Sequence, residues 1–321
     1  WSQFLKSPFY KGKADLAFDN QGNLYVCGSF TEEIVLFGDT ITNADNSRGF
    51  LAKLNTEGEL IWIKTIQSTG VFECSQVKID SQDRIYLGGN FTGSMSIDDQ
   101  DVTGSWDECS NHMFLASLDA TGSCQWIRHA VICDMEFFGL VDMELTSLGE
   151  PVVCGTYVKE ADFGDGVLLS TPVEAPFLVK YAAQGTPQWG TTISTESGFA
   201  ETFDVSVDDL DRVFMTGMHL GDVAFGEYEV TVEGDVMEEI FLARFDESGI
   251  CTALSSYGSQ GDGADFGFCY EPDSDTTGYL MGIYGDTLIM GIDRLEAVLN
   301  TGSALISSNM FIAQLKDLSL I

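Results

Sequence analysis

The sequence has few of the residues on which most hydrolase and metal sites depend. It contains three histidines, His112, His129 and His219, and they lack the close spacing of metal ligands. No G-x-S-x-G, H-E-x-x-H or C-x-x-C motif occurs. His219 stands at a position that aromatic residues fill in similar segments, so we expect it to be structural. We expect no cofactor from these absences.

Positive charge is also scarce. Fifteen lysines and arginines stand against 50 aspartates and glutamates, which gives a formal net charge of -35 and a pI near 4.1. Such a surface repels phosphate backbones and anionic lipid, so nucleic acid is not an expected partner. No run of about 20 apolar residues is present, so we expect no membrane insertion. The acidity is typical of a solvated acidic surface, and it also favours binding of cationic partners or of divalent cations.

Proline is rare, with six residues, whereas glycine is frequent, with 34 residues. Hydrophobic residues make up 44% of the chain and aromatic residues 12%, which is enough to build a large core. Since no helical periodicity accompanies them, the composition indicates an all-β protein with many tight turns. The eight cysteines are irregularly placed and permit one or two disulfides without implying any.

One sequence pattern occurs five times. It begins as FDNQGNLYVCGSF at Phe18 and as IDSQDRIYLGGNF at Ile79, and three looser copies follow. A phenylalanine segment such as FLAKL comes later in each copy, and a tryptophan follows it in the first three. The glycines that anchor the copies are 61 to 66 residues apart and are Gly28, Gly89, Gly155, Gly217 and Gly282. A period near 64 residues divides the whole chain into five units and leaves no room for a second domain.

Each copy predicts four antiparallel strands, A to D, joined by polar turns. We therefore expect residues 1–321 to form a single all-β domain, a five-bladed β-propeller with four-stranded blades. The fifth copy lacks a tryptophan strand, and the segment WSQFLKS at Trp1 resembles IWIKTIQ of the first copy. Residues 1–9 would then complete blade five beside residues from about 264 to 321, which would remove an open sheet edge.

The combination D-x-x-G-x-x-Y-x-x-G-S-F, followed by F-L-A-K-L and G-x-x-x-W, resembles the bacterial β-propeller repeats called SBBP repeats. The resemblance covers nearly the whole chain and is sharpest in the first two copies. It implies a secreted or cell-surface bacterial protein and carries no catalytic residues. The blade number differs from the seven that the family's name suggests.

The long connections between strands B and C predict the binding face, because propellers bind where their loops are elaborated. Several of these connections carry a short apolar and acidic element that we expect to form a small hairpin. The candidate contact residues on these elements are Phe37, Asp39, Asp98, Asp99, Asp165, Glu227 and Asp293.

Asp15, Asp142 and Asp204 occupy equivalent positions in strand A and would lie near the propeller axis. Carboxylates around a central funnel would suit a glycosidase, yet we expect these acids to accept hydrogen bonds from neighbouring blades or to line a small polar channel. Calcium is a further alternative, since carboxylate-rich turns supply the oxygen ligands it prefers. The weak calcium candidates are Asp162, Asp165, Asp273 and Asp275.

Together these patterns favour a non-enzymatic recognition, adhesion or scaffold module that binds a protein at the cell surface, within a larger assembly. The alternative is a carbohydrate site, lectin-like or hydrolytic, in the central funnel. Trp62, Trp126 and Trp189 should be largely buried between neighbouring blades.

Overall fold

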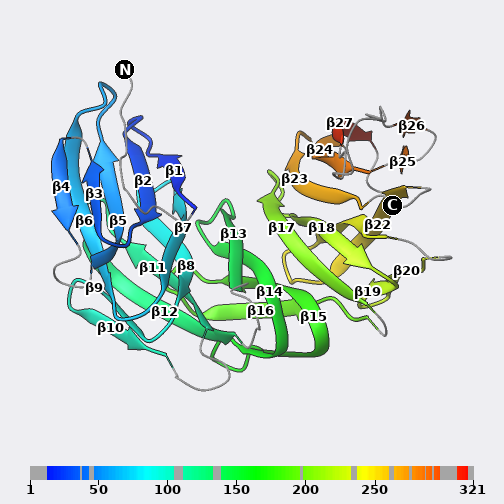
Figure 1. Ribbon diagram of the computed structural model, residues 1–321, viewed down its shortest axis with the longest axis horizontal. Helices are drawn as coiled ribbons and strands as arrows, with labels where there is room; N and C mark the ends of the chain where they lie inside the picture. Colours follow the sequence, from blue (N-terminus) through cyan, green and yellow to red (C-terminus); the bar gives the residue numbers. More distant parts are fainter. Residues whose placement is uncertain are drawn as a thin grey trace. The chain divides into compact units, whose positions relative to one another are not determined.

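A computed structural model describes residues 13–36, 38–42, 47–104, 111–132, 139–195, 198–232, 237–259, 264–274, 277–285, 287–290, 293–296 and 309–316. In these residues every regular element is a β-strand, and all strand pairs are antiparallel (Figure 1). The all-β prediction is therefore confirmed. Within the described ranges there is also no helix that could cross a membrane.

Four repeats each contain four antiparallel strands in the order A-B-C-D, as the sequence predicts. The first comprises β1 (Asp15–Phe18), β2 (Leu24–Ser29), β5 (Ser47–Leu54) and β6 (Leu60–Ser68); the second β7 (Phe72–Ile79), β8 (Ile85–Phe91), β11 (Asn111–Leu118) and β12 (Cys124–Ile132); the third β13 (Gly139–Leu145), β14 (Pro151–Asp162), β15 (Leu168–Tyr181) and β16 (Pro187–Thr192); and the fourth β17 (Phe199–Val207), β18 (Val213–Leu220), β21 (Glu239–Phe245) and β22 (Cys251–Ser259).

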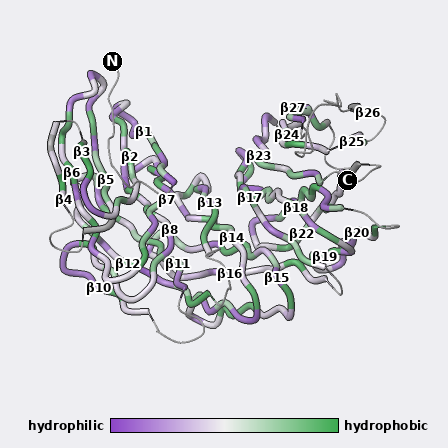
Figure 2. The backbone as a smooth tube through the Cα atoms, in the orientation of Figure 1, coloured by the Kyte–Doolittle hydropathy of each residue, from purple (hydrophilic) through white to green (hydrophobic). Residues whose placement is uncertain are grey.

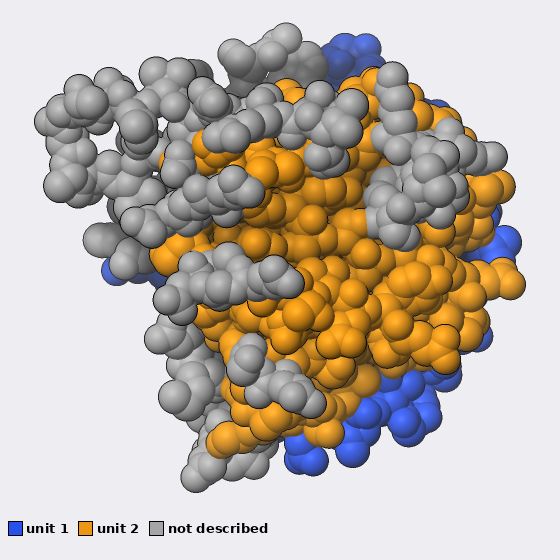
Figure 3. All heavy atoms as spheres, turned by 90° about the vertical axis from the view of Figure 1, so that its right-hand side faces the viewer, with its two compact units in different colours: residues 1–151, 160–168, 181–188 blue, residues 152–159, 169–180, 189–321 orange. Residues whose placement is uncertain are grey.

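The fifth repeat has three described strands, β23 (Phe266–Pro272), β24 (Thr277–Tyr284) and β27 (Asn309–Lys316). The predicted closure by residues 1–9 lies outside the described residues. By its internal contacts the chain divides into two units, residues 1–151, 160–168 and 181–188, and residues 152–159, 169–180 and 189–321 (Figure 3).

The repeated glycine and the repeated phenylalanine face each other across strands B and C. Gly28 pairs with Phe50 in register, and Gly89 pairs with Phe114. A Cβ atom on Gly89 would lie 2.8 Å from the Phe114 ring and 1.9 Å from a carbonyl oxygen of β7. The glycine therefore makes room for the phenylalanine ring, which is fully buried. Hydrophobic residues run along the strands, and polar residues gather at many turns (Figure 2).

Aspartate side chains shape the turns between strands A and B. The Asp19 carboxylate accepts hydrogen bonds from the backbone amides of Gln21 and Asn23, and Asp80 does the same for Gln82 and Arg84. This is the Asx-turn arrangement, in which a short acidic side chain replaces a backbone acceptor. The turn thus accounts for the aspartate at this position in the first and second repeats.

The connection between strands B and C forms a small hairpin in four repeats, which confirms the expected hairpins. They are β3 (Glu33–Leu36) with β4 (Asp39–Thr42), β9 (Ser94–Ile97) with β10 (Gln100–Thr103), β19 (Val223–Phe225) with β20 (Tyr228–Val230), and β25 (Thr287–Met290) with β26 (Asp293–Glu296). In the third repeat the same segment prolongs β14 and β15.

In repeats two to five, this connection between strands B and C is also tied to the repeat before it. β9 pairs with the end of β6, the end of β14 pairs with β12, Ala224 bridges to Ser194 after β16, and β25 pairs with β22. The sequence did not predict this pairing. It makes the connection of each of these four repeats part of the junction between two consecutive repeats.

Candidate functional site

The hairpin of the second repeat presents a polar surface at the end of strand β6. Gln67 pairs with Ser96, and Ser96 pairs with Asp101, so these three side chains lie on one face of the sheet. Met95 and Ile97 project to the other face and are buried. The hairpin therefore separates an apolar face, packed on the core, from a polar face in solvent.

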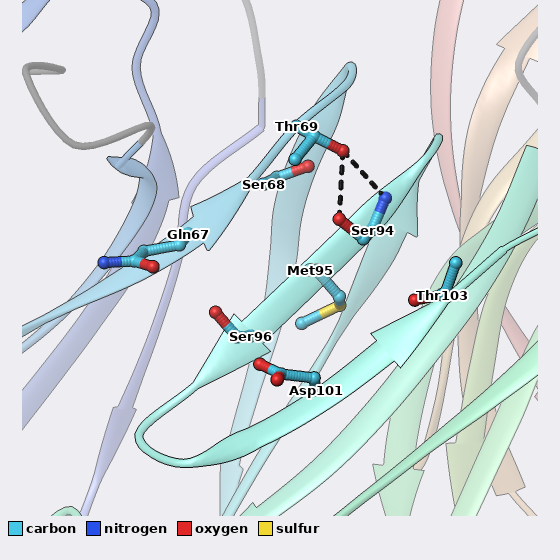
Figure 4. Close-up of a pocket in the computed structure, with 8 residues that line it drawn as sticks. All are labelled: Gln67, Ser68, Thr69, Ser94, Met95, Ser96, Asp101 and Thr103. Carbon is cyan, nitrogen blue, oxygen red and sulfur yellow. Dashed lines mark hydrogen bonds between the residues drawn. The ribbon is translucent and has the colours of Figure 1, made fainter.

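A shallow hollow of about 260 Å³ lies on this junction. It is lined by Gln67, Ser68, Thr69, Ser94, Met95, Ser96, Asp101 and Thr103 (Figure 4). The Thr69 and Ser94 hydroxyls are 3.0 Å apart, and the Ser94 amide donates to the Thr69 hydroxyl. Figure 4 shows the Asp101 carboxylate beside Ser96, while Gln67 points away from the other labelled side chains. Apart from Met95, the lining is made of hydroxyls, one amide and one carboxylate.

A second hollow, of about 390 Å³, occupies the equivalent place in the other unit. It lies where the hairpin of the fourth repeat meets the chain after β16, and its lining includes Ser194, Thr195, Asp222 and Glu229. Ala224 bridges to Ser194 and pairs with Glu229, as Ser96 pairs with Gln67 and Asp101. Glu229 thus stands at the register position of Asp101. We call these two sites the Asp101 hollow and the Glu229 hollow.

The tip of the second hairpin is anchored. The Asp98 carboxylate forms an ion pair with Lys64 of β6 and accepts a hydrogen bond of 2.8 Å from the Cys124 amide of β12. Burial alone would raise the pKa of Asp98, but the Cys124 amide and the Lys64 ammonium favour the carboxylate, and the net pKa is lowered. Asp98, predicted as a contact residue, joins neighbouring strands in the structure.

The other predicted contact residues divide between hairpin tips and hairpin strands. Asp99 and Glu227 are exposed at tips, and Asp165 is exposed in the turn between β14 and β15. Asp39 begins β4 and Asp293 begins β26. Phe37 lies outside the described residues.

Asp15 and Asp204, both on strand A of their repeats, hold the backbone of the next repeat. The Asp15 carboxylate accepts a hydrogen bond of 2.9 Å from the Val77 amide, and the Asp204 carboxylate accepts one of 2.9 Å from the Tyr270 amide. These are the hydrogen bonds to neighbouring repeats that the sequence led us to expect. Asp142 lies half-buried on β13.

The calcium candidates are found in ordinary turns. Asp162 accepts a hydrogen bond from the Gly164 amide, and Asp273 accepts one from the Thr277 hydroxyl. Asp275 lies outside the described residues. Across the described ranges, no three His, Cys, Asp or Glu side chains gather into a group that could hold a metal ion.

His219 is fully buried and bonded within its own repeat. Its Nδ1 lies 2.9 Å from the Gly221 carbonyl and its Nε2 lies 2.8 Å from the Ser256 hydroxyl. Burial lowers the pKa of His219. These contacts agree with the structural role expected from its aromatic-type position.

The tryptophans differ from the prediction of large burial, because Trp62, Trp126 and Trp189 are only half-buried. Each packs on the strand C to D turn glycine of the following repeat, and the three glycines are Gly122, Gly185 and Gly249. Each indole covers the turn but remains partly exposed to solvent. The tryptophans therefore lie between repeats, as expected, but at their outer margin.

No protein-family model matches the chain. Over 239 residues the chain is 22% identical to an uncharacterized WD repeat-containing protein of Acanthamoeba polyphaga mimivirus. The chain is β-propeller-like. This follows from the antiparallel sheet repeats together with the similarity to a WD-repeat protein. The matched region covers 60% of this β-propeller-like chain and 17% of the viral protein, so the chain spans less than a fifth of its relative.

Proposed function

We propose that the chain is a non-enzymatic recognition module that binds a protein partner through the face carrying the strand B to C hairpins. The observation that carries the proposal is the repeated construction of this face. At two equivalent junctions a hairpin buries its apolar side and turns hydroxyls and a carboxylate towards solvent. A surface built this way in more than one repeat suits an extended or repetitive partner. In keeping with its resemblance to SBBP repeats, we place the module on a bacterial cell surface.

For the fold we propose five blades, with residues 1–9 supplying the last strand of blade five. Gly58 has a φ of +80°, close to the values of Gly122, Gly185 and Gly249, each of which carries a tryptophan of the preceding repeat. Trp1 stands at the matching position of the repeat pattern. We therefore propose that the segment carrying Trp1 supplies the tryptophan strand that the fifth copy lacks.

Deleting residues 1–9 tests this assignment. We expect a loss of thermal stability far larger than that caused by removing two residues from the exposed turn between β14 and β15. A truncated protein that stays monomeric and keeps its full melting temperature would contradict closure by this segment.

The bonds of the strand-A acids favour binding over catalysis. A glycosidase needs two carboxyl groups in distinct environments, one of them free to donate a proton. Asp15 and Asp204 instead make the same bond to a neighbouring backbone amide. Turnover of a glycan panel that disappears in Asp142→Asn or Asp204→Asn would overturn the non-enzymatic assignment.

Carbohydrate binding is the second candidate, because the Asp101 hollow is rich in hydroxyls and has an amide and a carboxylate that can bond to sugar hydroxyls. A pull-down from cell-surface extracts and a glycan array, run side by side, separate the two candidates. Ser96→Arg should weaken capture of the true ligand at least tenfold by blocking the hairpin face. Gln82→Arg, in the exposed turn between β7 and β8, is the control and should leave capture unchanged.

A further inference from the structure

We propose that the Asp101 and Glu229 hollows are seats for lysine or arginine side chains of the protein partner. This inference rests on the proposed function, since it names the chemistry that the hairpin face recognises. It concerns two seats at equivalent junctions, each described within its own unit.

The first observation is that both carboxylates are exposed and uncompensated. Asp101 and Glu229 stand at the same register position of their hairpins, on the outer strand. Among the described residues no side chain or backbone group donates a hydrogen bond to either carboxylate, and no cation pairs with it. Asp98, three residues from Asp101, contrasts with both because it is held by Lys64 and the Cys124 amide.

The second observation is the lining around each carboxylate. Ser94, Ser96 and Thr103 surround Asp101, and Ser194 and Thr195 lie in the Glu229 hollow together with a second acid, Asp222. Hydroxyl oxygens can accept hydrogen bonds, and ammonium and guanidinium groups only donate them. None of the described residues that line the two hollows is a lysine or an arginine. The groups present therefore match a cation with several N–H donors.

The size of the hollows also favours a side chain over a larger ligand. The volumes of about 260 and 390 Å³ fall below or near the lower end of the range for pockets that enclose small molecules, roughly 300 to 1,000 Å³. The formal net charge of -35 adds a long-range attraction for a basic segment and repels anionic ligands. A lysine or arginine on a protein chain meets both conditions.

The first and fifth repeats show that the seats are local and are not a general result of acidity. The residue at the register position of Asp101 is Thr40 in the first repeat and Arg294 in the fifth. An acid at this place is therefore a property of particular junctions. The seats are expected at the hairpins of the second and fourth repeats.

The test uses the full chain and a peptide of four Lys-Ser units, with an acetyl-lysine version of the same peptide as the uncharged probe. The double variant Asp101→Asn with Glu229→Gln should weaken binding of the charged peptide at least fivefold. The control, Asp209→Asn with Glu57→Gln, removes the same charge from exposed turns between strands and should change the Kd less than twofold. Acetylation should abolish the difference between the two variants.

Equal loss in both double variants would show non-specific attraction and overturn the proposal. Capture of a glycan that is insensitive to the Asp101 and Glu229 changes would also overturn it. If Ser96→Arg blocks capture of the partner but the double variant does not, the proposal of lysine or arginine seats is overturned, whereas the proposal that the hairpin face binds the partner is supported. If neither change affects capture of the partner, the proposed function itself fails.

Discussion

Consecutive repeats are joined at two places, which we call the inner joint, between their strands A, and the outer joint, between strand D and the next strand C to D turn. The inner joint is made by hydrogen bonds, whereas the outer joint is made by the packing of an aromatic ring. At the inner joint one polar side chain of strand A bonds to the backbone of the next strand A, as Asp15 does with Val77 and Gln76 does with the Val141 carbonyl. At the outer joint a tryptophan ring packs on a turn glycine, as Trp126 does on Gly185.

The two joints tolerate sequence change differently. At the inner joint the strand-A side chain can be either a hydrogen-bond acceptor or a donor, because the backbone of the next strand A offers both an amide and a carbonyl. The outer joint needs a residue with a positive φ and no Cβ, since a Cβ on Gly185 would lie 2.9 Å from the Trp126 ring. The inner joint can vary its residue, whereas the outer joint must keep its glycine.

The largest effect should come from the outer joint. Trp126→Ala removes the ring that packs on Gly185 and lies 5.6 Å, at its centroid, from the Arg128 guanidinium. Because the ring is only half-buried, we expect a loss of about 2 to 3 kcal/mol in the free energy of unfolding, below the value for a fully buried tryptophan. Urea unfolding measures it, with Ile61→Ala, at an exposed strand-D residue, as the control. A loss similar to that of the control would show that the ring does not hold the joint.

A pair of glycine substitutions separates ring contact from backbone strain. Gly185 and Gly164 both have a φ of +86°, but nothing lies within 4 Å of a Cβ on Gly164. Gly164→Ala should cost about 1 kcal/mol through backbone strain alone. Gly185→Ala should cost about 1 kcal/mol more, because the methyl group meets the Trp126 ring. If both variants lowered the melting temperature equally, contact with the Trp126 ring would not contribute to the cost of Gly185→Ala.

The inner joint should give a smaller effect that depends on the replacement. Asp15→Ala leaves the Val77 amide without its acceptor and should cost about 1 kcal/mol. Asp15→Asn keeps an oxygen that can accept the same bond and should cost much less. Chemical denaturation of both variants provides the comparison, and an equal cost for both would mean that charge, and not the hydrogen bond, matters at this joint.

The smallest effect is expected at the hairpin tip and depends on pH. The pKa of Asp98 is lower in the folded protein than its ordinary value of 3.8, so its stabilisation is present above that pH and is lost as the pH falls through the folded pKa. The side chain is 41% exposed, so solvent screens the pair. Asp98→Asn should cost a few tenths of a kcal/mol at pH 7 and nothing near pH 2. If the difference in the free energy of unfolding between Asp98→Asn and the wild type grew as the pH fell, the expected pH dependence would be contradicted.

Much of the fold could be predicted from the sequence because the repeat places equivalent residues in equivalent contacts. Gly28 and Phe50 are conspicuous in the repeat, and they are the residues that face each other across strands B and C. The bonds of Asp15 and Asp204 follow from their shared position in strand A. The small hairpins follow from their alternating residues and turn glycines.

The pairing of the strand B to C connections in repeats two to five with the preceding repeat could not be predicted in this way. Gln67 and Ser96, which pair across β6 and β9, carry no pattern that relates them to each other. The hollows depend on that pairing, so Asp101 and Glu229 were not among the expected contact residues. The half-exposure of the tryptophans was missed for a similar reason, since repetition indicates a shared environment and not how open it is.

The pairing between hairpins and earlier strands also has a consequence for synthesis on the ribosome. The end of the first repeat's last strand, at Thr69, bonds to Ser94, which lies 25 residues later in the chain. A newly made repeat therefore leaves the ribosome with an unpaired strand end, and its partner is translated only with the next repeat. At a few residues per second, this open edge is exposed for seconds at each step, so translation speed and chaperone access should govern the yield of folded protein.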